Sequence, residues 1–360
     1  MPVTNSLKVA LGALVATGLV GAGAVVASSL GGDGSSSSSS TTTSATPTTG
    51  SATTTSSAVA PGSMPLGTLT VADPAPGGCP DGFTCSSFQI TCPGIDAELR
   101  GELAQRLPDS PRGVVMMFSG ERGDRWWGLG RGGPTAAFFN QASDAGLGIV
   151  QVRWPQGWIV APEGTEPGAA LLACAPATAA AWVHDNVYAP IAPSSSPAGV
   201  CGFCLTGNSG GSSQIAYALT RYGLATLVDG AVLTSGPTHT SLDAGCGLDP
   251  ASTDPALLFE PSAQASIDAS YGDGAPCSRR DASFADRLAA DSIDGVPAPD
   301  LGAVNLRILI GERDRTSAPS HAELFAAWLG GAEVTMVPEM PHTIEQSPSG
   351  LDALAGALTG

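Results

Sequence analysis

A serine between glycines is the first group in this sequence whose setting indicates chemistry. Ser209 lies in Gly207-Asn-Ser-Gly-Gly211, a G-x-S-x-G pattern that follows an apolar run and precedes a helix-like stretch. Such a strand–turn–helix corner strains the serine backbone and exposes its hydroxyl, and the glycines let strand and helix approach closely. Because the chain has 47 Gly, the pentapeptide alone is weak. The flanking elements therefore favour a nucleophile over a glycine-rich turn without chemistry.

A serine hydroxyl needs partners to react at neutral pH. An imidazole must take its proton, and a carboxylate must hold that imidazole in one tautomer and stabilise its charged form. The candidates for the base are few, because the chain has four His. His184 and His321 lie in expected helices, where packing or surface roles are usual. His239 follows an expected strand and is a candidate for lining a substrate pocket.

The chain resembles the α/β-hydrolases, with Gly207-Asn-Ser209-Gly-Gly211 in the place of that family's nucleophile turn. The resemblance covers about residues 113–360. It implies a fixed chain order, in which the serine comes first, an acid follows a later strand, and a histidine lies near the C-terminus.

Both later elements are present. Asn305-Leu-Arg-Ile-Leu-Ile-Gly-Glu-Arg-Asp314 matches a strand that ends in Gly with an acid three residues on, and Pro338-Glu-Met-Pro-His342 follows the last expected strand. The resemblance thus implies Ser209 as nucleophile, His342 as general base and then acid, and Asp314 as the orienting acid. Glu312 is the rival acid.

An acyl-enzyme mechanism also needs donors for the developing oxyanion. The backbone N–H of Gly210 is the first candidate. The second is expected in the loop after the strand at 113–118, where the family often has His-Gly and this chain has Phe118-Ser-Gly120. That departure leaves Gly120 and Glu121 as equal candidates.

Large side chains follow two of the expected strands. Trp126 and Trp127 follow one, and Trp154 and Trp158 the next. They are candidates for an aromatic rim that binds acyl chains or sugar rings, and packing of loops against the core is an equal alternative. Arg122 and Arg153 are candidates for binding a substrate carboxylate, although surface ion pairing is commoner for Arg.

From residue 113 onward, short apolar runs alternate with helix-like stretches, a pattern typical of parallel strands joined by helices. We therefore expect an α/β fold: a mostly parallel central sheet with helices on both faces, as in the α/β-hydrolases. The expected strands are 113–118, 147–152, 199–206, 226–233, 305–310 and 333–337, after leading strands at 67–72 and 87–91. The expected helices are 134–145, 167–188, 212–222, 320–329 and 348–358. The segment at about 235–303 is too long for a plain crossover and is expected to be an inserted cap.

The N-terminal segment is expected to carry the chain across a membrane. Residues 9–30 are uncharged, and residues 1–30 are either a cleaved signal peptide, cut after Ala27, or an uncleaved anchor. Residues 31–65 form a Ser/Thr-rich tract too polar to pack, and we expect a disordered linker. Residues 66–360 then form a single catalytic domain that is secreted or held at the cell surface.

The eight Cys all lie after residue 78, and an even number in an exported chain favours disulfides. Cys246 with Cys277, and a pair among Cys79, Cys85 and Cys92, are suggested by proximity. Cys201 and Cys204 have zinc-ligand spacing, but they fall in an expected strand. Residues three apart in a strand point to opposite faces, so we expect these two Cys to pair elsewhere.

The net charge of −17 excludes a nucleic-acid binder that relies on phosphate contacts and a basic membrane-surface helix. Membrane contact is expected only through residues 9–30, if they are retained. We expect an exported serine hydrolase acting on a small-molecule, lipid or polymer ester. A peptidase or amidase with the same triad is one alternative, and a non-catalytic binding protein on the same scaffold is another. No metal or organic cofactor is implied, because the proposed mechanism has its own nucleophile and proton carrier.

Overall fold

The computed structural model describes residues 63–72, 77–128, 132–192, 201–252 and 254–359. The expected signal or anchor, and nearly all of the expected linker, lie outside these residues. Within the described ranges, no helix combines the length and hydropathy that crossing a bilayer requires.

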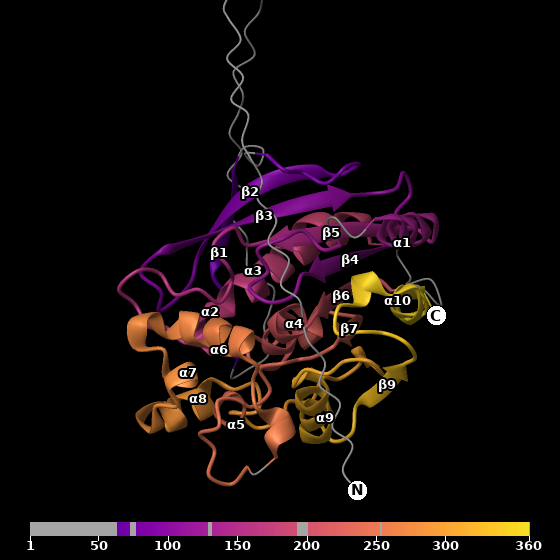
Figure 1. The fold of residues 1–360 in the computed structure, drawn as a ribbon. Helices are drawn as coiled ribbons and strands as arrows, with labels where there is room; N and C mark the ends of the chain where they lie inside the picture. The colour runs from indigo at the N-terminus through magenta and orange to yellow at the C-terminus, as the bar shows by residue number, and fades with distance from the viewer. Residues whose placement is uncertain (1–62, 73–76, 129–131, 193–200, 253, 360) are drawn as a thin grey trace, which may run out of the picture. The chain divides into compact units, whose positions relative to one another are not determined.

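A nine-stranded sheet runs through the described part of the chain (Figure 1). Its strand order is β1-β2-β3-β5-β4-β6-β7-β8-β9. The strands are β1 (Thr68–Ala72), β2 (Thr84–Thr91), β3 (Glu98–Arg106), β4 (Gly113–Phe118), β5 (Leu147–Arg153), β6 (Phe203–Asn208), β7 (Gly230–Thr234), β8 (Asn305–Gly311) and β9 (Glu333–Val337).

Strand direction divides the sheet into two parts. β1, β2 and β3 pair antiparallel, and β3 pairs antiparallel with β5. From β5 through β4, β6, β7 and β8 to β9, every pairing is parallel. The carboxyl ends of β6, β8 and β9 therefore meet at one edge of the sheet, where sites in open α/β sheets form.

The central strands are mostly apolar because both faces of the sheet are covered. All six residues of β4 are buried, and its alternate side chains enter two different clusters: Val114, Met116 and Phe118 in one, Val115 and Met117 in the other. This alternation is the period-two geometry of a strand between two helical layers.

Helices supply those two layers. The first cluster includes side chains from α3 (Cys174–Val183), α4 (Gly210–Thr220) and α9 (Ala318–Trp328), and the second includes side chains from α1 (Gly133–Asp144) and α10 (Pro348–Thr359). A short helix, α2 (Ala169–Leu172), precedes α3. Proline occupies one of the first helical positions of α1 and α9, where its missing N–H costs no hydrogen bond. The expected α/β fold with helices on both faces is confirmed.

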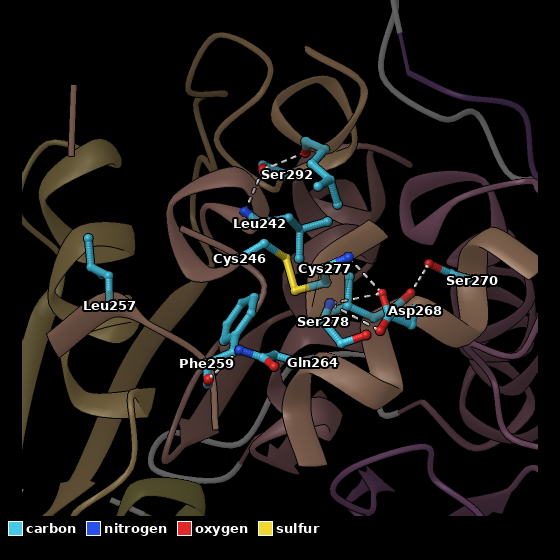
Figure 2. The surroundings of a disulfide bond; sticks show 12 residues. Leu242, Cys246, Leu257, Phe259, Gln264, Asp268, Ser270, Cys277, Ser278 and Ser292 are labelled. Carbon is cyan, nitrogen blue, oxygen red and sulfur yellow. Dashed lines mark hydrogen bonds between the residues drawn. A yellow bond between two sulfur atoms is a disulfide. The ribbon is translucent and has the colours of Figure 1, made fainter. Parts of the chain in front are cut away.

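The expected insertion lies between β7 and β8 and is helical. It contains α5 (Leu242–Gly245), α6 (Pro261–Asp268), α7 (Pro276–Arg279) and α8 (Ala285–Asp291). Figure 2 shows the Cys246–Cys277 disulfide of this insertion beside the buried Asp268. The Asp268 carboxylate accepts the N–H of Cys277 at 2.7 Å. The disulfide and this hydrogen bond join α5, α6 and α7, which are too short to be stable alone.

The disulfides confirm part of the expected pairing. Cys246 pairs with Cys277, Cys79 with Cys85, and Cys92 with Cys174. The expectation for Cys201 and Cys204 was wrong, because these two Cys bond to each other. β6 begins at Phe203, so Cys201 precedes the strand and the chain bends there, which brings the two Cα atoms to 5.9 Å.

Other differences from expectation lie in the strands. β3 was not predicted, because Glu98, Arg100 and Glu102 interrupt its apolar pattern. The strand expected at 226–233 begins only at Gly230, after a 3₁₀ turn at Leu224–Thr226. These segments are defined by cross-strand partners, which local patterning does not reveal.

Candidate active site

Ser209 is held at the corner between β6 and α4. Its backbone has φ 55° and ψ −117°, a conformation that a residue with a side chain adopts only under strain. The Ser209 N–H donates to the carbonyl of Thr234 at 2.8 Å. The corner thus presents a serine in the strained geometry of a nucleophile turn.

Hydroxyl groups beneath the corner hold it in place. The Ser212 hydroxyl donates to the carbonyl of Gly207 at 2.6 Å and accepts the N–H of Thr234 at 3.0 Å. The Thr234 hydroxyl also reaches the Gly207 carbonyl, at 3.0 Å. Ser212 and Thr234 are buried, so these bonds are shielded from competing water.

The end of β8 and the loop after β9 bring an acid and an imidazole together. Nδ1–H of His342 donates to Oδ2 of Asp314 at 2.8 Å. The other carboxylate oxygen, Oδ1, accepts the hydroxyl of Thr316 at 2.7 Å and its N–H at 3.0 Å. Burial raises the pKa of the Asp314 carboxyl, but the hydrogen bond and charge of His342, together with the Thr316 bonds, outweigh that effect and hold the pKa below its ordinary value.

Glu312 lies elsewhere. It is exposed, and its carboxylate faces the backbone N–H of Glu339 at 3.5 Å. The two acids therefore differ in direction, although they are only two residues apart.

The histidine loop is tied directly to the serine corner. Oδ1 of Asn208, the residue before Ser209, accepts the N–H of Ile344 at 3.3 Å. The N–H of Arg313 donates to the carbonyl of Met340 at 3.0 Å, which joins the acid loop to the same segment. These bonds set the position of His342 relative to both of the other residues.

Ser209 and His342 line the same two cavities. Both residues line a cavity of about 310 Å³ and a smaller one of about 150 Å³. Among the described hydrogen bonds, none joins the Ser209 hydroxyl to the His342 ring, and such bonds commonly form only when substrate excludes water. Nδ1 of His342 is occupied by Asp314, so Nε2 is the nitrogen available to the serine.

Two backbone N–H groups lie beside Ser209. Gly210 is the first residue of α4, so its N–H is one of those that a helix end leaves without an intrahelical partner. A Cβ built on Gly210 would contact the carbonyl of Glu121 and would lie 3.0 Å from the Glu121 nitrogen. Glu121 has φ 51°. Gly120 also lies close to the serine, because a Cβ built on it would be 3.5 Å from the Ser209 Cβ. The Gly210 and Glu121 peptides are therefore adjacent.

The tryptophans differ in their surroundings. Trp126 lines the larger cavity with Ser209, and its Nε1–H donates to the carbonyl of Gly78 at 2.7 Å. Trp127 packs on Phe138, and Trp154 donates to Gln214 at 2.9 Å. Neither Trp127 nor Trp154 lines the two cavities described above.

The arginines considered for substrate binding have internal partners. Nε of Arg153 donates to Glu102 on the neighbouring strand at 2.8 Å, and its guanidinium lies over the Trp126 ring at 4.8 Å. Arg122 donates to the carbonyl of Ala265 in α6 at 3.2 Å.

His239 and His321 are buried in the neighbourhood of the smaller cavity. His239 lines that cavity and stacks on Trp158, with 5.6 Å between ring centroids. Burial lowers the pKa of His239 to about 3, with His321 adding to the effect. Burial also lowers the pKa of His321 to about 4, against the hydrogen bond of its Nε2 to the Leu257 carbonyl at 2.9 Å. Both rings are therefore neutral at physiological pH.

Sequence reasoning missed two polar residues of the site. Thr316 holds the acid, and Asn208 connects the serine corner to the histidine loop. The first has a local signal, because Asp-x-Thr favours a side-chain-to-backbone turn. Asn208 has none, since its partner is 136 residues away. Across the described residues, no group of three or more His, Cys, Asp or Glu is arranged to hold a metal ion.

The sheet order and the serine corner after β6 define an α/β-hydrolase fold. No protein-family model and no curated protein matches the sequence. Solved structures that resemble this chain include a hyperthermophilic esterase from Pyrobaculum calidifontis, at 17% identity, a TM-score of 0.46, and coverage of 76% of this chain and 82% of that one. A thermostable esterase from Pseudomonas putida has 17% identity, a TM-score of 0.46 and coverage of 78% and 82%. A dienelactone hydrolase from Anabaena variabilis has 14% identity, a TM-score of 0.40 and coverage of 76% and 94%.

Proposed function

We propose that this protein hydrolyses carboxylic esters through an acyl-enzyme on Ser209. The observation that carries the proposal is the 2.8 Å hydrogen bond between His342 and Asp314, beside cavities that His342 shares with a strained serine. A buried carboxylate that orients an imidazole next to a serine is the arrangement needed to activate a hydroxyl.

The chemistry begins as the Ser209 hydroxyl adds to the ester carbonyl carbon and His342 Nε2 takes its proton. The resulting oxyanion accepts hydrogen bonds from the N–H of Gly210 and from the N–H of Glu121 or Gly120. As the carbon–oxygen bond to the alcohol breaks, His342 returns the proton to the departing oxygen. Asp314 stabilises the imidazolium in both steps.

Water completes the cycle. His342 takes a proton from water, the hydroxide adds to the acyl carbon, and the bond to Ser209 breaks as its oxygen regains the proton. The carboxylic acid is then released. Each group therefore ends in its starting state, and the reaction consumes only ester and water.

The proposed setting is outside the cytoplasm. Four disulfides among the described residues are typical of an oxidising compartment. The proposed substrate is an uncharged ester. The acids Glu121, Asp124 and Glu345 line the larger cavity against one lining cation, Arg125, which pairs with the first two, and the remaining negative charge disfavours anions.

The test uses the chain secreted with its disulfides formed. We expect hydrolysis of p-nitrophenyl acetate and labelling by a fluorophosphonate, which peptide mapping places on Ser209. Ser209→Ala and His342→Ala are each expected to lower kcat by about 10⁴-fold or more. Ser283→Ala, in a surface turn of the insertion, is the matched control and retains activity.

Two results would contradict the proposal. A folded chain that neither hydrolyses esters nor reacts with the probe would favour a binding protein on this scaffold. Turnover of anilides at rates equal to those of matched esters would instead favour an amidase.

A further inference from the structure

The smaller cavity beside Ser209 has a wall that is partly apolar and partly polar. Its apolar part comes from Phe259, Ala263 and Ile267 of the insertion, and its polar part includes Thr238, Ser266 and His239. The cavity measures about 150 Å³, whereas the cavity on the Trp126 side measures about 310 Å³. An ester bound at Ser209 must divide between these two spaces.

His239 is the one strongly buried imidazole in this wall among the described residues. Only 6% of its surface is exposed, and its Nδ1 has no hydrogen-bond partner. Trp158 stacks on one side of the ring, and the edge of Tyr217 lies 6.1 Å from it by ring centroids. The proposed mechanism makes no use of His239, yet an unpaired buried nitrogen is costly and rare in folded proteins.

The neutral state of the ring defines what it would bind. With its pKa near 3, His239 carries one N–H and one lone pair. A half-turn about the Cβ–Cγ bond exchanges Nδ1 with Cδ2 and Nε2 with Cε1 within the same ring plane, so the ring has two ways of placing its donor and its acceptor. A hydroxyl both donates and accepts, and it therefore satisfies the ring in either tautomer.

The order of bond breaking decides which half of the ester enters which cavity. The alcohol leaves first and must reach solvent while the acyl group is still attached to Ser209. The larger cavity has about twice the volume of the smaller one and the exposed, charged side chains of Asp124 and Arg125 in its wall, so we assign that exit to it. The acyl group then belongs in the smaller cavity, under α6.

We infer, on the basis of the proposed ester hydrolysis, that the smaller cavity binds a short acyl group carrying a hydroxyl, and that His239 determines this specificity by hydrogen bonding to that hydroxyl. At about 30 Å³ for each water-sized group, 150 Å³ holds about five non-hydrogen atoms. The carbonyl carbon and oxygen stay at Ser209, so the part of a hydroxybutanoyl group that must enter this space has four non-hydrogen atoms and fits. The corresponding part of an octanoyl group has seven and does not.

The experiment compares ethyl butanoate with its 2-hydroxy and 3-hydroxy derivatives, by pH-stat. The expected kcat/KM of the preferred hydroxy ester exceeds that of ethyl butanoate by about 3- to 10-fold, the usual effect of one neutral hydrogen bond. In His239→Phe, which keeps an aromatic ring against Trp158, this ratio falls to about one. His239→Gln, which restores a donor and an acceptor, recovers part of it. The ratio is independent of the fraction of folded enzyme, so a loss of stability does not disguise the result.

A control substitution and two longer esters test whether His239 and the acyl side of the site set the specificity. His184→Phe makes the same replacement outside the cavity and leaves the ratio unchanged. Ethyl octanoate is expected to be a poor substrate, whereas octyl butanoate is not. Three results would each overturn the inference. The wild type could show a ratio of kcat/KM for the hydroxy ester to that for ethyl butanoate near one, or this ratio could be the same in His239→Phe as in the wild type. The third result is a wild type that selects the chain length of the alcohol rather than that of the acyl group. Failure of the wild type to hydrolyse any ester would instead overturn the proposed function.

Discussion

At the scale of single residues, Asp314 and Glu312 show how two acids only two positions apart acquire different surroundings. Asp314 follows the last strand residue by three positions, and its turn directs the carboxylate to His342. Glu312 leaves the strand on the exposed side. The difference comes from the turn, whose Asp314 N–H donates to the Gly311 carbonyl at 3.0 Å.

We predict that Asp314→Asn lowers kcat by about 10³- to 10⁴-fold, because an amide neither holds the His342 tautomer nor stabilises the imidazolium. Glu312→Gln is the matched change and is expected to stay within a few-fold of wild type. Steady-state kinetics on p-nitrophenyl acetate measure both. Loss of activity in Glu312→Gln with retention in Asp314→Asn would reassign the acid.

At the scale of elements, the contact between β6 and α4 depends on glycine. A Cβ at Gly207 would lie 2.5 Å from the carbonyl carbon of Gly211 and 2.9 Å from the nitrogen of Ser212. These atoms belong to the backbone of the helix and cannot move as a side chain would. The strand and the helix that orient Ser209 can therefore meet only without a side chain at residue 207.

Gly207→Ala is predicted to destabilise the fold by about 1–3 kcal/mol, the usual cost of overpacking, and to lower kcat/KM by displacing Ser209. The control is Gly356→Ala in α10, where a Cβ meets nothing within 4 Å. That change should stabilise by up to about 1 kcal/mol through helix propensity. Urea unfolding gives the free energies, and equal effects of the two substitutions would contradict the packing argument.

At the scale of the whole molecule, two buried imidazoles couple stability to pH. The pKa of His239 is lowered to about 3 and that of His321 to about 4, whereas both have a pKa of about 6.5 in the unfolded chain. At pH values between the lowered and the ordinary pKa, the unfolded chain therefore binds more protons than the folded one. Stability then falls as pH falls through this window. Burial, followed by the charge of Asp243, raises the pKa of Asp294 to about 6. This raised pKa makes stability increase as pH falls, the opposite of the histidine effect, but the pKa shift is smaller.

We predict that the wild type loses thermal stability between pH 6.5 and pH 4 and that His239→Phe flattens this dependence. The reason is that Phe binds no proton in either state, which removes one of the two larger contributions. Melting temperatures across the pH range, measured with the disulfides intact, provide the check. Parallel pH profiles for the two proteins would show that His239 is not a source of the dependence.

Local order in the sequence was enough for much of the fold and for the strand–turn–helix corner at Ser209. β4 and α10 were predicted nearly to the residue, because apolar runs and helical periodicity depend on neighbours along the chain. The strand–serine–helix corner was equally readable, since its glycines and both flanking elements lie within one stretch.

Contacts between distant segments were decided only by the tertiary structure. The sequence by itself determined which residues end the strands. The strand order decided that Asp314 and His342 meet. It also decided that Trp126 and His239 line cavities with Ser209, whereas Trp127 and Trp154 pack elsewhere. The bond between Cys201 and Cys204 depended on where β6 begins. The physical reason is that pairing and burial depend on partners far away in the chain, which no local pattern encodes.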